Sequence, residues 1–210
     1  MSKNNKTYYQ LILDSSSSMA SVAIETMDAF NDQIEAIRRL QEQHPDQEVR
    51  VSLTTFDTFI DYTLDRTRPE DVPELSRASY RPRRMTSLLD AMGHSIQRLQ
   101  AQVGDEIAED RATAVVVTLT DGYENASKRY SHWDVATMID QLQGDGSWTF
   151  SFLGADIDAF RVASSLGIHR CNTRSILKED LQKSFDEVNG AMEEHLLAKT
   201  LGRKKRHFLD

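Results

Sequence analysis

Cysteine is almost missing from this sequence: Cys171 is the only one, so no disulfide can form within the chain. This favours a reducing compartment, because disulfides persist mainly in oxidising ones. Long hydrophobic runs are missing as well. No stretch approaches the length of a membrane span, and the first residues lack the apolar core of a signal peptide. We therefore expect a cytoplasmic protein with no membrane partner.

Positively charged residues are fewer than negatively charged ones. The 25 lysines and arginines are outnumbered by 33 aspartates and glutamates, which gives a formal net charge of −8 at pH 7. Such a balance argues against a general nucleic-acid binder, which normally presents a basic face. The one basic cluster, "GRKKRH" at 202–207, is interpreted as a solvated helix end whose cations complement the helix dipole. A nucleic-acid contact by this cluster is the weaker alternative.

Strand and helix patterns alternate along the 210 residues, of which 39% are apolar, enough for one α/β domain with a sizeable core. The predicted strands cover 8–14, 48–56, 59–65, 112–120, 148–155 and a short edge strand at 168–172. The predicted helices cover 27–40, 89–103, 135–142, 159–166 and 181–196. The segment 66–84 holds three of the four prolines and no sustained period, which indicates a long connection.

This alternation predicts an α/β fold of the doubly wound type, with a mostly parallel sheet and helices on both faces. The segments 48–56 and 59–65 are close enough to form a hairpin, which adds one antiparallel edge strand. The continuous aliphatic run that begins at Ala112 is typical of a central strand covered on both faces. We expect one domain over 1–200, followed by a basic C-terminal tail at 201–210.

Polar side chains follow two of these strands and precede one helix. Asp14, Ser16 and Ser18 end the first strand, Asp121 ends the most apolar strand, and Thr86 opens the strongest helix. Because the carboxyl ends of parallel strands share one edge of a sheet, these residues are expected to converge on one pocket. Their ligand atoms are all oxygens, which suit Mg²⁺, Mn²⁺ or Ca²⁺ rather than zinc.

The order of these residues resembles a known site. Asp-x-Ser-x-Ser at 14–18, a lone threonine at a helix start, and Thr-Asp-Gly at 120–122 are similar to the metal-ion-dependent adhesion site (MIDAS) of von Willebrand factor type A domains. The resemblance is closest to small cytoplasmic bacterial and phage members of that family. It also includes the stretches "TDGYENAS" and "WTFSFLGAD", and it extends from about Tyr8 to Leu197.

The resemblance implies a role for each residue. Ser16 and Ser18 would coordinate the metal through their hydroxyls, and Thr86 would bind it directly or through water. Asp14 and Asp121 would hold coordinated waters, orient the serines, or coordinate directly. With neutral hydroxyls as its ligands, a cation keeps most of its charge and seeks a Glu or Asp carboxylate from a protein partner.

Two segments depart from the family pattern. Ser17 stands where the family usually has glycine, and Arg84 and Met85 replace the small residues that usually precede the threonine. Glycine at such positions serves backbone torsion or close approach. Arg84 would either crowd the metal or attract an acidic partner. With these departures, a metal site that has decayed is an alternative.

Three functions follow from these observations. The first is a non-enzymatic interaction module that binds a divalent cation and recruits an acidic protein partner. The second is a metal-dependent phosphatase or phosphotransfer enzyme with Asp14 as its nucleophile. The third is an assembly protein with a decayed metal site.

Simpler structural interpretations exist for the same residues. The serines at 15–18 also fit a helix cap and turn, and Thr86 a helix N-cap. Glu124 and Asn125 are interpreted as loop-capping residues. The six histidines lack metal-ligand spacing and are expected on helices or the surface. Trp133 and Trp148 are expected in the core.

Overall fold

The computed structural model describes residues 4–205 and 207–209. Residues 1–3, part of the segment without a signal-peptide core, and Arg206 of the basic cluster lie outside the described residues. The strands are β1 (Lys6–Asp14), β2 (Glu48–Phe56), β3 (Ile60–Thr67), β4 (Ala112–Thr120), β5 (Trp148–Ala155) and β6 (Thr173–Ile176). The α-helices are α1 (Ala23–Gln43), α2 (Leu88–Ala108), α3 (His132–Gln143), α4 (Ala159–Ser165) and α5 (Leu181–Thr200). Four short 3₁₀ helices are η1 (Ser17–Val22), η2 (Pro69–Asp71), η3 (Arg170–Asn172) and η4 (Lys178–Asp180).

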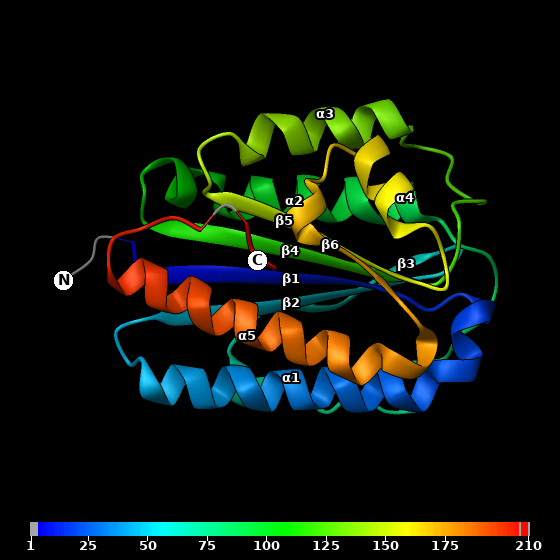
Figure 1. Cartoon of the computed structure of the whole chain (residues 1–210), viewed down its shortest axis with the longest axis horizontal. Coiled ribbons are helices and arrows are strands. Elements are labelled where there is room, and N and C mark those ends of the chain that lie inside the picture. The colour runs from blue at the N-terminus through cyan, green and yellow to red at the C-terminus, as the bar shows by residue number, and fades with distance from the viewer. Residues whose placement is uncertain (1–3, 206, 210) are drawn as a thin grey trace.

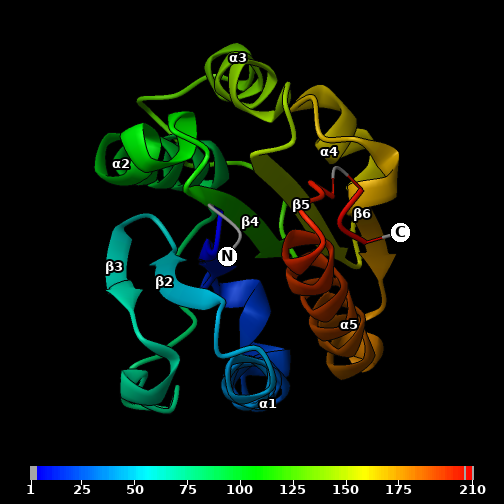
Figure 2. The same ribbon diagram turned by 90° about the vertical axis from the view of Figure 1, so that its left-hand side faces the viewer.

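The six strands form one sheet in the order β3-β2-β1-β4-β5-β6. All neighbouring pairs are parallel except β2 and β3, which are antiparallel. Helices α1 and α5 cover one face of the sheet, and α2, α3 and α4 cover the other (Figures 1 and 2). The predicted doubly wound sheet with one antiparallel edge strand is therefore confirmed.

Each face of the sheet has its own hydrophobic core. Alternating side chains of β1 divide between them: Leu11 and Leu13 pack with the stripe of α1, whereas Ile12 packs with α2. Every residue of β4 is buried, as the aliphatic run predicts for a central strand. Helices therefore cover both faces of β1 and β4, the strands that carry polar residues at their carboxyl ends.

The edge strand lies further along the chain than predicted. The segment 168–172 was expected as a strand, but its last three residues form η3, and β6 begins at Thr173. The ring of His169 accepts a hydrogen bond from Cys171 N at 3.3 Å, which starts a tight turn there. Thr173 and Ile176 are β-branched, pair with β5, and suit a strand better than the turn residues.

The prediction that Trp133 lies in the core is wrong, whereas Trp148 is buried as expected. Trp133 is 74% exposed in the first turn of α3. The buried stripe of that helix consists of Val135 and Ile139. A residue two positions before Val135 is on the opposite side of the helix, so Trp133 faces outward.

The C-terminal tail turns back onto the body of the protein after α5. Gly202 has φ of +69°, and the Arg203 amide donates to Ala198 O at 2.9 Å. Arg203 and Lys204 are exposed, but Phe208 and Leu209 are buried. Within the described residues, no helix is sufficiently long and apolar to span a membrane.

Candidate metal centre

The five predicted site residues lie together at the carboxyl edge of the sheet. Asp14 is the last residue of β1, and Asp121 directly follows β4. These strands are parallel neighbours, so both carboxylates reach the same edge. The chain runs from β1 to β2 on one side and from β4 to β5 on the other, so the direction of the connections reverses between β1 and β4. Open α/β sheets bind ligands at such a switch point. Thr86 joins them from the segment before α2.

Asp14 is fully buried, and both of its carboxylate oxygens accept hydrogen bonds. Ser16 N donates to Oδ1 at 2.7 Å, and the Thr120 hydroxyl donates to Oδ2. Burial and, to a lesser extent, the nearby charge of Asp121 raise the pKa of Asp14 to about 6 despite these donors. The Tyr80 hydroxyl donates to the backbone carbonyl of Asp14. Asp14 therefore orients the serine loop from beneath.

The two serine hydroxyls form a chain toward Asp121. Ser16 Oγ lies 3.1 Å from Ser18 Oγ, and Ser18 Oγ donates to Asp121 Oδ1 at 2.6 Å. Ser16 occupies the N-cap position of η1, but its side chain makes no capping hydrogen bond. A helix cap therefore does not account for the hydroxyl of Ser16, which faces the site instead.

Thr86 faces the same space from the opposite side. A Cβ placed on Gly122 would lie 2.9 Å from Thr86 Oγ1 and 3.7 Å from Ser18 Oγ, so the glycine keeps a gap between the two hydroxyls open. Thr86 is not the N-cap of α2, because that position belongs to Ser87. Asn125 holds Thr86 in place: its side-chain Oδ1 accepts from Thr86 N at 2.9 Å, and its backbone N–H donates to Thr86 O at 3.0 Å.

Glu124 and Asn125 are loop-capping residues, as predicted. The Glu124 carboxylate accepts from Leu89 N at 2.9 Å, in the first turn of α2. It also accepts from Ala126 N at 2.8 Å and from Ser127 N at 2.7 Å. The loop after β4 is thereby fastened to the start of α2, which fixes Thr86 relative to Asp121.

Lys178 brings a positive charge to the site, and no sequence pattern indicated it. Its Nζ lies 2.6 Å from Asp121 Oδ2 and 3.2 Å from Ser18 O. The first contact is an ion pair without a well-directed hydrogen bond, since no donor is aligned with Asp121 Oδ2. Lys178 begins η4, just after β6, so its approach depends on where that edge strand ends.

The two departures from the family pattern cause little distortion. Ser17 is the first residue of η1, an ordinary helical backbone that needs no glycine. Arg84 has φ of +64°, a left-handed conformation that favours glycine. Its guanidinium points toward Asp57, with Nη1 2.9 Å from Oδ2, and lies 4.9 Å from the ring centre of Phe59. Arg84 therefore does not crowd the metal site.

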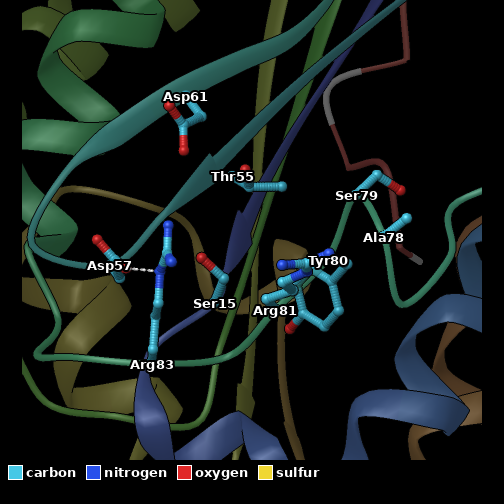
Figure 3. A pocket seen from close by; sticks show the side chains of 9 residues that line it. All are labelled: Ser15, Thr55, Asp57, Asp61, Ala78, Ser79, Tyr80, Arg81 and Arg83. Atoms are coloured by element: carbon cyan, nitrogen blue, oxygen red, sulfur yellow. Dashed lines mark ion pairs between the residues drawn. The ribbon is translucent and has the colours of Figure 1, made fainter.

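A polar pocket of about 260 Å³ lies beside the serine loop (Figure 3). Ser15 is part of the serine loop and also lines this pocket. Its backbone N–H donates to Phe56 O, and its carbonyl accepts from Arg83 N. In Figure 3, Asp57 and Arg83 point toward each other across this pocket, and Arg83 Nε lies 3.5 Å from Asp57 Oδ2. Arg81 and Arg83 line this pocket, and the same segment 77–84 also carries Arg77 and Arg84.

Large apolar side chains are exposed on the loops around the site. Phe59 is 61% exposed, Met85 54%, Tyr123 47% and Leu177 54%. Each is on a segment that contacts the centre: Phe59 lies beneath Arg84, Met85 precedes Thr86, Tyr123 follows Gly122, and Leu177 precedes Lys178.

The residues present fit a hard divalent cation. All the side-chain atoms that converge are hydroxyl or carboxylate oxygens, which Mg²⁺, Mn²⁺ and Ca²⁺ prefer. Asp121 Oδ2 is buried and pairs with the ammonium of Lys178 at 2.6 Å, so this oxygen already faces a positive charge. Because Gly122 has no side chain, there is room between the hydroxyls of Ser18 and Thr86.

The comparisons with known proteins agree with this fold. The family model of the von Willebrand factor type A domain matches residues 10–167. The vWF domain of the type V pili tip protein Mfa5 from Porphyromonas gingivalis is 11% identical, with a TM-score of 0.62 over 92% of this chain and 97% of that chain. The PilB minor pilin from Streptococcus sanguinis is 14% identical, with a TM-score of 0.62 over 92% of this chain and 62% of that one.

One similar structure contains a metal. Proximal thread matrix protein 1 from the mussel byssus, with a zinc-occupied MIDAS motif, is 11% identical, with a TM-score of 0.61 over 92% of this chain. This chain spans 48% of that protein, about half its length. No curated protein sequence matches this one. At such low identities, the solved structures show a shared fold.

Proposed function

Because this chain belongs to the von Willebrand factor type A domain family, we propose that it is a non-enzymatic protein-interaction module. Its MIDAS-type site binds Mg²⁺, or Mn²⁺ or Ca²⁺, through Asp14, Ser16, Ser18, Thr86 and Asp121, and recruits an acidic protein partner. The single cysteine fits action in the cytoplasm, where thiols stay reduced.

The chain of hydroxyls carries this proposal. Ser16, Ser18 and Thr86 offer neutral oxygens, so a cation held by them keeps charge for an external carboxylate. Asp14 lies beneath the loop with one donor on each oxygen, whereas Asp121 Oδ2 has only its ion pair with Lys178, which a metal ion would replace. A Glu or Asp side chain from a partner would complete such a site.

The surroundings of the site favour a protein as the ligand. The exposed apolar side chains of Phe59, Met85, Tyr123 and Leu177 provide area that a partner can bury. The arginines of segment 77–84 favour an acidic partner by charge, although the whole chain is acidic. Arginine is also enriched in protein interfaces.

The burial of Asp14 argues against the phosphatase alternative. A carboxylate nucleophile needs an open line to phosphorus, whereas Asp14 is 0% exposed and donors cover both oxygens. An assay with a phosphate ester tests this directly. Metal-dependent turnover that disappears in Asp14→Asn would favour the enzyme over the interaction module.

The test of the proposal has two stages. Calorimetry with Mg²⁺ and Mn²⁺ first measures metal binding, and no heat at millimolar metal would favour the decayed site. Affinity capture then compares Mg²⁺ with EDTA. We expect the unaltered protein to retain a partner in Mg²⁺ but not in EDTA. In Mg²⁺, Asp46→Asn should still retain the partner and Asp121→Asn should lose it. Asp46 is an exposed acid on the connection between α1 and β2, far from the site, and serves as the matched control. Equal retention in EDTA would contradict a metal bridge.

A further inference from the structure

A second group of metal-binding side chains lies at the amino end of β6, away from the carboxyl edge that carries the MIDAS-type site. His169 and Cys171 come from the turn that contains η3, and His207 comes from the C-terminal tail. One ligand atom from each of the three lies within 4.8 Å of the others. The ring centres of His169 and His207 are 5.0 Å apart.

Packing on either side of His207 holds it beside His169. Phe208 is fully buried, and its amide donates to Asn172 Oδ1 at 2.6 Å. The guanidinium of Arg174 donates to Leu209 O. On the other side, Lys205 Nζ pairs with Glu194 on α5. The tail therefore reaches this edge by its own contacts, and the histidines meet as a consequence.

The chemistry of the three groups differs from that of the MIDAS-type site. Two imidazoles and one thiolate form a nitrogen and sulfur set, which suits Zn²⁺ and not Mg²⁺. Tetrahedral zinc with these ligands separates its ligand atoms by roughly 3.3–3.6 Å. Both histidines are exposed, so small rotations of their rings bring the ligand atoms from within 4.8 Å to that spacing.

The charges around the group are compatible with a cation. Arg174 donates to Cys171 O at 3.4 Å, but its guanidinium is paired with Glu187 Oε2 at 2.9 Å. The Arg170 guanidinium lies over the ring of Phe160, 4.4 Å from its centre. A thiolate would offset one of the two charges of zinc.

We propose that His169, Cys171 and His207 bind one Zn²⁺ ion, which fastens the C-terminal tail to the β6 edge of the sheet. Three protein ligands leave the fourth position for water or another small ligand. This site is independent of the MIDAS-type site, because the two share no residue and prefer different metals.

Cobalt is the probe for this site. Co²⁺ substitutes for zinc and shows an intense charge-transfer absorption when a thiolate binds it, whereas oxygen ligands give none. Cys171 is the only cysteine, so this absorption reports on one place. We expect it to saturate at one Co²⁺ per chain and to disappear when Zn²⁺ is added. Cys171→Ser should abolish it, and Asp121→Asn should leave it unchanged.

The histidine variants decide whether the tail takes part. His207→Gln and His169→Gln should each weaken Co²⁺ binding by about tenfold or more. His132→Gln, an exposed histidine on α3, should not. Zn²⁺ should slow tryptic cleavage after Arg203 and Lys204 in the unaltered protein but not in His207→Gln. No charge-transfer absorption, a ratio of two chains per Co²⁺, or unchanged affinity in His207→Gln would each overturn the proposal.

Discussion

Lys178 and Asp121 form an ion pair at the centre of the MIDAS-type site, with 2.6 Å between Nζ and Oδ2. The same ammonium donates to Ser18 O at 3.2 Å. A lysine therefore neutralises the carboxylate that a divalent cation would use. Metal binding at Asp121 and Ser18 must displace this ammonium or tolerate its charge.

Removing that charge should tighten metal binding. Lys178→Met keeps most of the aliphatic stem and deletes the ammonium. We expect Mg²⁺ affinity to rise about tenfold, which corresponds to about 1.4 kcal/mol. Calorimetric titration measures it. Lys183→Met, an exposed lysine on α5, is the control, and equal affinities in the two variants would show that Lys178 does not compete with metal.

The left-handed backbone at Arg84 predicts an unusual order of stabilities. Arg84→Ala and Arg84→Gly both remove the ion pair with Asp57, but only glycine adopts φ of +64° without strain. We expect the glycine variant to be more stable than the alanine variant by about 1 kcal/mol in urea unfolding. At an ordinary helical position the order is reversed. A more stable alanine variant would mean that this backbone is not strained.

Bound metal should stabilise the protein without being needed for folding. The two cores on the faces of the sheet contain the buried apolar side chains, and the site lies at their rim. In EDTA we expect an unchanged circular-dichroism spectrum. Mg²⁺ at ten times its dissociation constant adds about 1.4 kcal/mol, which raises Tm by about 3–6 °C. Asp121→Asn should show no such rise, and a spectrum that collapses in EDTA would contradict the prediction.

The sequence predicted the fold and the convergence of the five candidate site residues because their pattern is local. Their role as metal ligands stays a prediction. Asp14, Ser16 and Ser18 lie within one short loop, and the strands before Asp14 and Asp121 are strongly apolar. Parallel pairing then brings both ends to one edge. Lys178 could not be found in this way, because its contact with Asp121 depends on β6, which begins later than its sequence pattern suggested.

The contacts of the C-terminal tail could not be predicted from the sequence either. His169 and His207 have no metal-ligand spacing along the sequence, and they meet only because Gly202 turns the chain back toward the sheet. The burial of Phe208 then fixes the tail. Contacts between distant segments of this kind depend on tertiary packing, which periodicity and composition do not encode.

The last prediction concerns a buried lysine. Lys199 is on the buried face of α5, in its last turn. Its Nζ donates to Lys6 O, to Thr7 Oγ1 at 2.8 Å and to Thr113 Oγ1 at 3.1 Å. Burial lowers the pKa of Lys199 to about 7. Burial also lowers the pKa of the neighbouring His195 to about 3, so that this ring is neutral at and above pH 7.

The lowered pKa of Lys199 makes the protein more stable as the pH rises above 7. Between about 7 and its unfolded pKa of 10.5, the unfolded chain keeps the Lys199 proton and the folded chain releases it. The free energy of unfolding should therefore increase by up to about 1.4 kcal/mol per pH unit in this window. Urea unfolding between pH 7 and 9 measures the slope, below the range in which tyrosines titrate. Lys199→Met should flatten it and Lys183→Met should keep it. If stability is constant over this range in the unaltered protein, Lys199 keeps its proton in the folded state.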